Sequence, residues 1–194
     1  MLQNKKVIIF DMDGTLIDSV GIWIANDYLV NVVDYKAGAE KVIAKLKHNG
    51  YTLVIATTTK KSNMDIYRTA NSNIKAKAAI DEYFSKVYTR EDAKEIKPNP
   101  EIYLTMMKEL EASPEECLIF EDSLIGVEAA NNAGIEVVAM VDRYSDHDRE
   151  RINACSDVQF HDYEEVLRFI EADNNSSPLS NSSNVNVEES ATLK

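Results

Sequence analysis

The sequence predicts an α/β fold in which helices cover both faces of a parallel sheet. Strand-like and helix-like segments alternate from residue 7 to residue 170, and such alternation is typical of parallel sheets. The strand-like segments are short, uninterrupted apolar runs, as expected for strands that are buried on both faces. Segments with apolar residues at helical spacing lie between them, so the connections are expected to be helices.

Four apolar runs are predicted to be strands, and a fifth is a weaker candidate. The four runs are VIIF at residues 7–10, LVIA at 53–56, LIF at 118–120 and VVAMV at 137–141, and the weaker candidate is KVYT at 86–89. The first predicted helix has apolar positions at Ala39, Val42, Ile43 and Leu46, and Gly50 supplies its stop. The helix pattern recurs at Tyr103, Met106, Met107 and Leu110. Later helices are expected at residues 123–133, 146–154 and 163–171, the last with Asp162 as N-cap and Glu165 three residues on.

The length and composition predict one domain and a tail. The chain has 194 residues, of which 44% are hydrophobic, which is enough for a single core of ordinary size. We expect this domain to span residues 1–171. Ten of the thirteen residues from 174 to 186 are serine or asparagine, so residues 172–194 are predicted to form a disordered tail without chemistry of its own.

The charge balance limits the partners that we expect. With 33 acidic and 21 basic side chains, the formal net charge is −12, which repels nucleic acids and anionic membranes at long range. We expect neither as a partner, and any phosphate ligand must be captured locally. The N-terminus leads directly into a strand-like segment without a signal-peptide core, so a cytoplasmic location is expected. Cys117 and Cys155 are expected to be reduced thiols.

The first predicted strand is followed by an acidic pair. The string DMDGT at residues 11–15 places Asp11 and Asp13 at the carboxyl end of a central strand, where ligand sites of open parallel sheets lie. Gly14 permits the tight loop that brings the two carboxylates together. Two close carboxylates need a shared proton or a cation, and Mg²⁺ would satisfy them and also bind phosphate. An acidic turn without chemistry is the alternative.

Three further segments carry polar residues of complementary types. ATTTK at residues 56–60 follows the second predicted strand and offers hydroxyls and backbone N–H groups to phosphate oxygens. EIKPNP at residues 95–100 contains two prolines, which stiffen the loop so that Lys97 can point inward. EDS at residues 121–123 adds a second acidic pair, Glu121 and Asp122, after the strand at 118–120. Each segment alone has a structural explanation, but their combination is specific.

Together these segments resemble the four motifs of the haloacid dehalogenase superfamily, in its phosphatase and β-phosphoglucomutase-like branch. The strings that carry the resemblance are FDMDGTLIDS, LVIATTT, IKPNPEIY and IFEDSLIGVEAANNAG. The resemblance implies a Rossmannoid, three-layer core with the first strand at its centre. It also implies Mg²⁺-dependent phosphomonoester hydrolysis through an aspartyl-phosphate, with small phosphorylated metabolites such as sugar phosphates as substrates.

The resemblance also implies a role for each site residue. Asp11 would be the nucleophile, and Asp13 would protonate the leaving alcohol and then deprotonate water. Dehalogenation is not expected, because family members that act on carbon–halogen bonds lack the second acid. The hydroxyl of Thr57 and a backbone N–H of Thr58 or Thr59 would bind the phosphoryl group, and Lys97 would neutralise its charge. The implied Mg²⁺ ligands are Asp11, Asp13, Glu121 and Asp122.

Residues 20–35 stand where this branch carries a multi-helix cap. Sixteen residues suffice for about one helix of roughly 24 Å at 1.5 Å per residue. Because a mutase needs a cap to hold its intermediate, the short segment favours a phosphatase over a sugar phosphomutase. A weakly active or non-catalytic binding protein is the other alternative. Eleven of the sixteen residues are apolar, so the segment is expected to pack on its own core, with a homodimer contact as the competing hypothesis.

Overall fold

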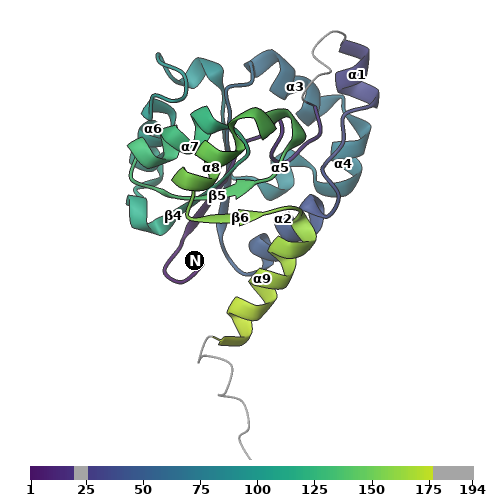
Figure 1. Ribbon diagram of the computed structural model, residues 1–194. Coiled ribbons are helices and arrows are strands. Elements are labelled where there is room, and N and C mark those ends of the chain that lie inside the picture. Colours follow the sequence, from purple (N-terminus) through teal and green to yellow (C-terminus); the bar gives the residue numbers. More distant parts are fainter. Residues whose placement is uncertain (20–25, 177–194) are drawn as a thin grey trace, which may run out of the picture.

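A computed structural model describes residues 1–19 and 26–176 of the chain. Within these residues six strands form one parallel sheet in the order β3-β2-β1-β4-β5-β6. The first strand, β1 (Val7–Phe10), lies between β2 and β4. The other strands are β2 (Thr52–Ala56), β3 (Lys86–Tyr88), β4 (Cys117–Glu121), β5 (Glu136–Met140) and β6 (Val158–Phe160). Figure 1 shows the helices packed around this sheet. The predicted α/β fold is confirmed.

Helices lie on both faces of the sheet and enclose two separate cores. One core includes residues of α1 (Asn26–Asn31), α2 (Ala39–His48), α3 (Lys61–Thr69), α4 (Ser72–Ala78), α5 (Ile80–Tyr83) and α9 (Tyr163–Ser176). The other includes residues of α6 (Glu101–Leu110), α7 (Leu124–Asn132) and α8 (Arg149–Cys155). Three short 3-10 helices, η1 (Arg90–Asp92), η2 (Pro114–Glu116) and η3 (Arg143–Asp148), complete the described elements. The arrangement is the predicted three-layer one.

The central strand shows how the apolar runs determine these layers. Ile8 and Phe10 of β1 face one core, whereas Val7 and Ile9 face the other, because successive side chains of a strand point to opposite faces. All four are buried, as the uninterrupted apolar run predicts. No helix among residues 1–19 and 26–176 combines the length and the apolar composition that crossing a membrane requires.

Several predicted boundaries are corrected by the structure. The strand β6 and the helices α3, α4 and α5 were not predicted, because β6 has only three residues and residues 61–83 carry few apolar positions at helical spacing. The helix predicted at residues 146–154 is divided between η3 and α8. Helix α9 continues to Ser176, past the predicted end at residue 171, because neither glycine nor proline interrupts residues 171–176. Residues 177–194 of the predicted tail lie outside the described residues.

The described part of the short segment at residues 20–35 packs on its own domain. Leu29, Val33 and Tyr35 are buried in the same core as α2 and α3, and Figure 1 shows α1 beside α3 and α4. The fully buried side chain of Asn71 donates hydrogen bonds to the carbonyl oxygens of Leu29 at 2.6 Å and Val33 at 2.9 Å. Packing on the core, as expected, therefore holds for these residues. Residues 20–25 lie outside the described part, and a homodimer contact remains a prediction.

We expect Asn71→Ala to destabilise the protein by about 2–4 kcal/mol, because the Leu29 and Val33 carbonyl groups lose the buried Asn71 amide as a donor and α4 loses its N-cap. The same side chain accepts a hydrogen bond from the backbone N–H of Ile74 at 2.8 Å. Asn73→Ala is the matched control, since the Asn73 amide is only partly buried and its contacts to the Asn31 and Val33 carbonyl oxygens are long, at 3.4 and 3.3 Å. Urea denaturation measures both variants, and equal losses would show that Asn71 does not hold the segment.

Candidate active site

The four predicted site segments converge at the carboxyl edge of the sheet. Phe10 of β1 pairs with Ile55 of β2 and Phe120 of β4, so the residues that follow these strands are neighbours in space. The backbone N–H of Asp11 donates to the Phe120 carbonyl oxygen at 3.0 Å. Strand ends that share a register therefore place Asp11, Thr57 and Glu121 side by side, as the strand-end pattern predicts.

Lys97 joins three of these strand ends. Its Nζ donates to Asp11 Oδ1 at 2.8 Å, to Glu121 Oε1 at 2.9 Å and to the Ala56 carbonyl oxygen at 3.0 Å. The ammonium also lies 5.2 Å from the centre of the Tyr103 ring, within the range of a cation–π contact. Only 3% of Lys97 is exposed, so the lysine points inward from its proline-rich loop.

The buried carboxylates outnumber the buried cation. Burial is the main cause that raises the pKa of Asp11 to about 7, while Lys97 lowers it in part and Glu121 raises it further. Burial, Glu121 and Asp11 together hold the pKa of Asp122 well above its usual range. Burial alone would lower the pKa of Lys97, but Asp11 and Glu121 outweigh burial and raise it. The site therefore carries an excess of negative charge that a cation would relieve.

The oxygen-only donor set suits a hard divalent cation. Among the described residues, no three His, Cys, Asp or Glu side chains are already arranged to hold a metal ion. Glu121, whose role as a ligand stays a prediction, accepts hydrogen bonds through Oε1 from Lys97 and through Oε2 from the N–H groups of Asp122 at 2.8 Å and Ser123 at 2.9 Å. The electrostatic fit for a cation rests mainly on Asp11 and Asp122.

Two glycines make room for the acidic side chains. Gly14 has a φ of +90°, and a Cβ there would lie 2.5 Å from Asp122 Oδ2. Gly14 thus permits both the predicted turn and the close approach of Asp122. A Cβ on Gly126 of α7 would overlap the Glu121 carboxylate. Both positions therefore require glycine for the carboxylates to keep their places.

Asp122 is held by residues that the sequence did not single out. The buried hydroxyl of Thr15 donates to Asp122 Oδ1 at 2.7 Å, and the hydroxyl of Ser145 donates to Oδ2 at 3.3 Å. The hydroxyl of Tyr163 in turn donates to the Thr15 carbonyl oxygen at 3.1 Å. Thr15 lies within the first motif string, so its position was a usable signal. Ser145 and Tyr163 carried no such signal, because both are far from the first motif in the sequence.

Asp13 lies in a cluster of hydroxyl groups. Ser19 and Thr59 both donate hydrogen bonds to its carboxylate, and the hydroxyl of Tyr67 donates to Asp13 Oδ1 at 3.2 Å. Thr57, predicted to bind phosphate, donates through its hydroxyl to Thr59 Oγ1 at 3.1 Å. The second predicted phosphate-binding residue, Thr58, is exposed. The structure therefore brings Asp13 together with the loop that follows β2.

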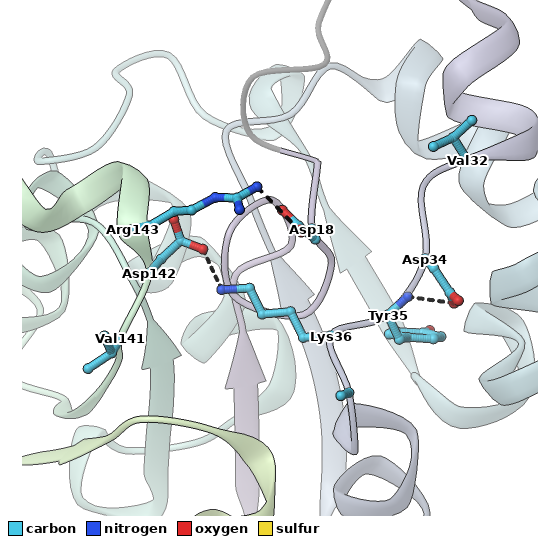
Figure 2. Close-up of a pocket in the computed structure, with 9 residues that line it drawn as sticks. Asp18, Val32, Asp34, Tyr35, Lys36, Val141, Asp142 and Arg143 are labelled. Carbon is cyan, nitrogen blue, oxygen red and sulfur yellow. Dashed lines mark hydrogen bonds and ion pairs between the residues drawn. The ribbon is translucent and has the colours of Figure 1, made fainter.

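An open cleft of about 530 Å³ adjoins this edge of the sheet. Figure 2 shows Lys36 reaching Asp142 and Arg143 reaching Asp18 across it, with N–O distances of 2.5 and 3.8 Å. Asp142 follows β5 closely, so the strand-end rule that found Asp11 would also have found it. The cleft residues are Asp18, Val32, Asp34, Tyr35, Lys36, Ala37, Val141, Asp142 and Arg143.

Residues 24–140 of the chain match a protein family that is described as haloacid dehalogenase-like hydrolase. The chain is 34% identical over 108 residues to protein CbbY of Rhodobacter capsulatus. The aligned region covers 56% of this chain and 46% of that protein. It is 46% identical over 57 residues to the phosphorylated carbohydrates phosphatase of Thermotoga maritima, covering 29% of this chain and 26% of that protein. The chain thus spans less than half the length of these relatives.

Solved structures share the fold. CbbY from Rhodobacter sphaeroides in complex with phosphate matches with a TM-score of 0.69 at 21% identity, covering 84% of this chain and 96% of that one. A hydrolase from Pseudomonas syringae matches with a TM-score of 0.69 at 18% identity, covering 87% of this chain and 99% of that one. At these identities the likeness establishes the fold of the described core.

Proposed function

The chain belongs to the haloacid dehalogenase-like hydrolase family, and from this membership and its site we propose that it is a phosphatase that hydrolyses phosphate monoesters through an aspartyl-phosphate on Asp11. One observation carries the proposal, namely the buried ammonium of Lys97 at 2.8 Å from Asp11 Oδ1. A preorganised cation beside a carboxylate nucleophile lets a phosphate dianion approach an anion.

The first step transfers the phosphoryl group to the enzyme. Because Lys97 holds Oδ1, we assign the attack on phosphorus to Asp11 Oδ2. The bond between phosphorus and the ester oxygen breaks, its electron pair stays on that oxygen, and the leaving alcohol takes the proton of Asp13. Lys97 and the hydroxyl of Thr57 stabilise the charge on the phosphoryl oxygens during the transfer.

The second step regenerates the enzyme. Asp13 is now a carboxylate and takes a proton from water while the water oxygen attacks phosphorus. The bond between phosphorus and Asp11 breaks, inorganic phosphate leaves, and both aspartates return to their starting protonation states. Asp11 and Asp122, with the backbone carbonyl of Asp13, would hold Mg²⁺. The ion would supply positive charge that offsets carboxylate repulsion and orients the phosphate.

Sugar phosphates are the substrate class that we propose. Support comes from the name of the Thermotoga maritima relative, a phosphorylated carbohydrates phosphatase, at 46% identity over 57 residues. The cleft beside the site supports it as well, since its carboxylates and cations, such as Asp18, Asp142 and Lys36, can accept and donate hydrogen bonds to hydroxyl groups. A screen of sugar phosphates against phosphorylated non-sugar alcohols tests this point.

The covalent intermediate provides a direct test of the mechanism. The protein is mixed with a phosphomonoester and Mg²⁺ for a short time, quenched in acid and digested. We expect the peptide that contains Asp11 to gain the mass of one phosphoryl group, and the gain to be lost after treatment with neutral hydroxylamine, which cleaves acyl phosphates. Asp11→Asn is the control. Phosphate release without a labelled peptide at any quench time would contradict the aspartyl-phosphate.

Mg²⁺ affinity is expected to rise about tenfold between pH 6 and pH 8, because a cation must displace the proton of a carboxyl group whose pKa is about 7. Affinity rises with pH because the pKa of Asp11 is raised to about 7, so that its protonated form dominates at pH 6 and its carboxylate at pH 8. Calorimetric titration with Mg²⁺ measures the affinity. Asp122→Ala should weaken binding at both pH values, whereas Asp34→Ala, on the cleft wall, should leave it unchanged. Equal affinity at both pH values would contradict this placement of the cation.

A further inference from the structure

The carboxylate of Asp13 is held from three different elements of the fold. Ser19 lies after β1, Thr59 lies in the loop after β2, and Tyr67 lies on α3, and each directs a hydroxyl to Asp13. Ser19 and Tyr67 donate to Oδ1, whereas Thr59 donates to Oδ2. The two oxygens of Asp13 therefore have different surroundings.

We propose that Tyr67 is a positioning residue for the acid–base group Asp13, which it holds through its hydroxyl on Oδ1 so that Oδ2 exchanges the proton with the substrate. This inference rests on the proposed phosphatase function. Oδ2 is the oxygen on the side of Thr59, whose hydroxyl and backbone N–H both contact Thr57 Oγ1, and Thr57 is the proposed phosphate-binding residue. Proton exchange is thus assigned to the oxygen nearest the phosphate loop.

The placement of Tyr67 suits a fixed hydrogen-bond donor. Tyr67 is 1% exposed and forms the buried face of α3 together with Met64. From this buried face the Tyr67 hydroxyl donates to Asp13 Oδ1 at 3.2 Å. Since α3 packs beside α1 and α4, the donor comes from the fixed core and needs no moving cap.

A purely structural tyrosine would not need this contact. The ring of Tyr67 fills the core between the sheet and the helices, and phenylalanine would fill the same space. The hydroxyl reaches the carboxylate of a residue 54 positions earlier in the chain. Removing only this oxygen therefore separates the packing role of the ring from the positioning role of the hydroxyl.

The test compares Tyr67→Phe with the unaltered protein on aryl phosphates with leaving phenols of graded acidity. We expect kcat/KM to fall about tenfold for the least acidic phenol, a fraction of the 10²–10⁴-fold that general acid–base catalysis contributes. For nitrophenyl phosphate, whose leaving group needs little protonation, the fall should be less than about twofold. The dependence of log(kcat/KM) on leaving-group pKa should therefore become steeper.

Two further variants complete the design. Tyr88→Phe is the matched control, because Tyr88 is buried, does not line the cleft, and directs its hydroxyl to Glu109 Oε2 at 2.8 Å rather than to Asp13. Ser19→Ala removes the other donor to Oδ1, so it should also steepen the dependence and serves if Tyr67→Phe does not fold. An unchanged slope in folded Tyr67→Phe, with or without a uniform loss of rate, would overturn the inference. Absence of phosphate release by the unaltered protein would instead contradict the proposed function.

Discussion

Asp11→Asn is expected to reduce phosphate release by about 10³-fold or more, as the loss of a nucleophile does in other covalent mechanisms. The amide keeps the shape of the side chain but cannot form the aspartyl-phosphate. Folding should be retained, because the pKa of Asp11 is raised to about 7, chiefly by burial, and replacement by a neutral group relieves that cost. We expect the thermal unfolding midpoint at pH 8 to be unchanged or higher.

Steady-state phosphate release and calorimetric melting at pH 8 test the two parts of this prediction separately. Retention of more than about a tenth of the rate would remove Asp11 as the nucleophile, since removing the attacking group costs far more than that. A large loss of stability would mean that the Asp11 carboxylate stabilises the fold, contrary to its raised pKa.

Lys97→Met is expected to cost about 3–5 kcal/mol of stability at pH 8, because it leaves buried carboxylates without their cation. Lys97 currently lowers the pKa of Asp11, so the substitution should raise that pKa further. The folded state then binds a proton that the unfolded chain has already released above about pH 4. Stability should therefore fall as the pH rises from 5 to 8, and the variant should be least affected at pH 5.

Urea denaturation at pH 5 and pH 8 measures this dependence. The matched control is Lys77→Met, because Lys77 forms a partly exposed ion pair with Asp34, and such pairs contribute about 0–1 kcal/mol. Equal losses for the two lysine variants, or a loss for Lys97→Met that does not grow with pH, would contradict the electrostatic role assigned to Lys97.

Much of the site was predictable because the strands are buried on both faces. Their apolar runs fix where each strand ends, and parallel pairing then brings the residues that follow to one edge. Asp11 and Glu121 were predicted in this way, whereas Lys97 was predicted from its proline-rich loop. The same rule also predicts Asp142, which follows β5. The ion pair of Asp142 with Lys36 lies at the cleft.

Other contacts could not be predicted because their partners are distant in sequence and of ordinary type. Tyr67 lies on a helix whose first turn is polar, and nothing near it in sequence indicates that its hydroxyl meets Asp13. Asn71 donates to carbonyl groups some 40 positions earlier in the chain. A sequence does not indicate which backbone carbonyl groups a side chain will bind. The metal role of Glu121 comes from the family resemblance and stays a prediction.

The short segment before α2 bears on the choice among functions. Leu29, Val33 and Tyr35 are buried in the core, and Asn71 holds the same segment by its carbonyl groups. The described part of this segment therefore packs on the core, and Val32, Asp34 and Tyr35 line the cleft. A segment that packs on the core supports hydrolysis, in which water must reach the intermediate, over a mutase that must exclude water while its intermediate turns.

Phosphate release from a small aryl phosphate by the purified protein tests the central claim most directly. The assay is run with Mg²⁺, with excess chelator, and with Asp11→Asn as the control for contaminating phosphatases. We predict release that requires Mg²⁺ and disappears in the variant. Release that is equal in the unaltered protein and Asp11→Asn, or no release under any condition, would contradict the phosphatase proposal and favour a binding role for this site.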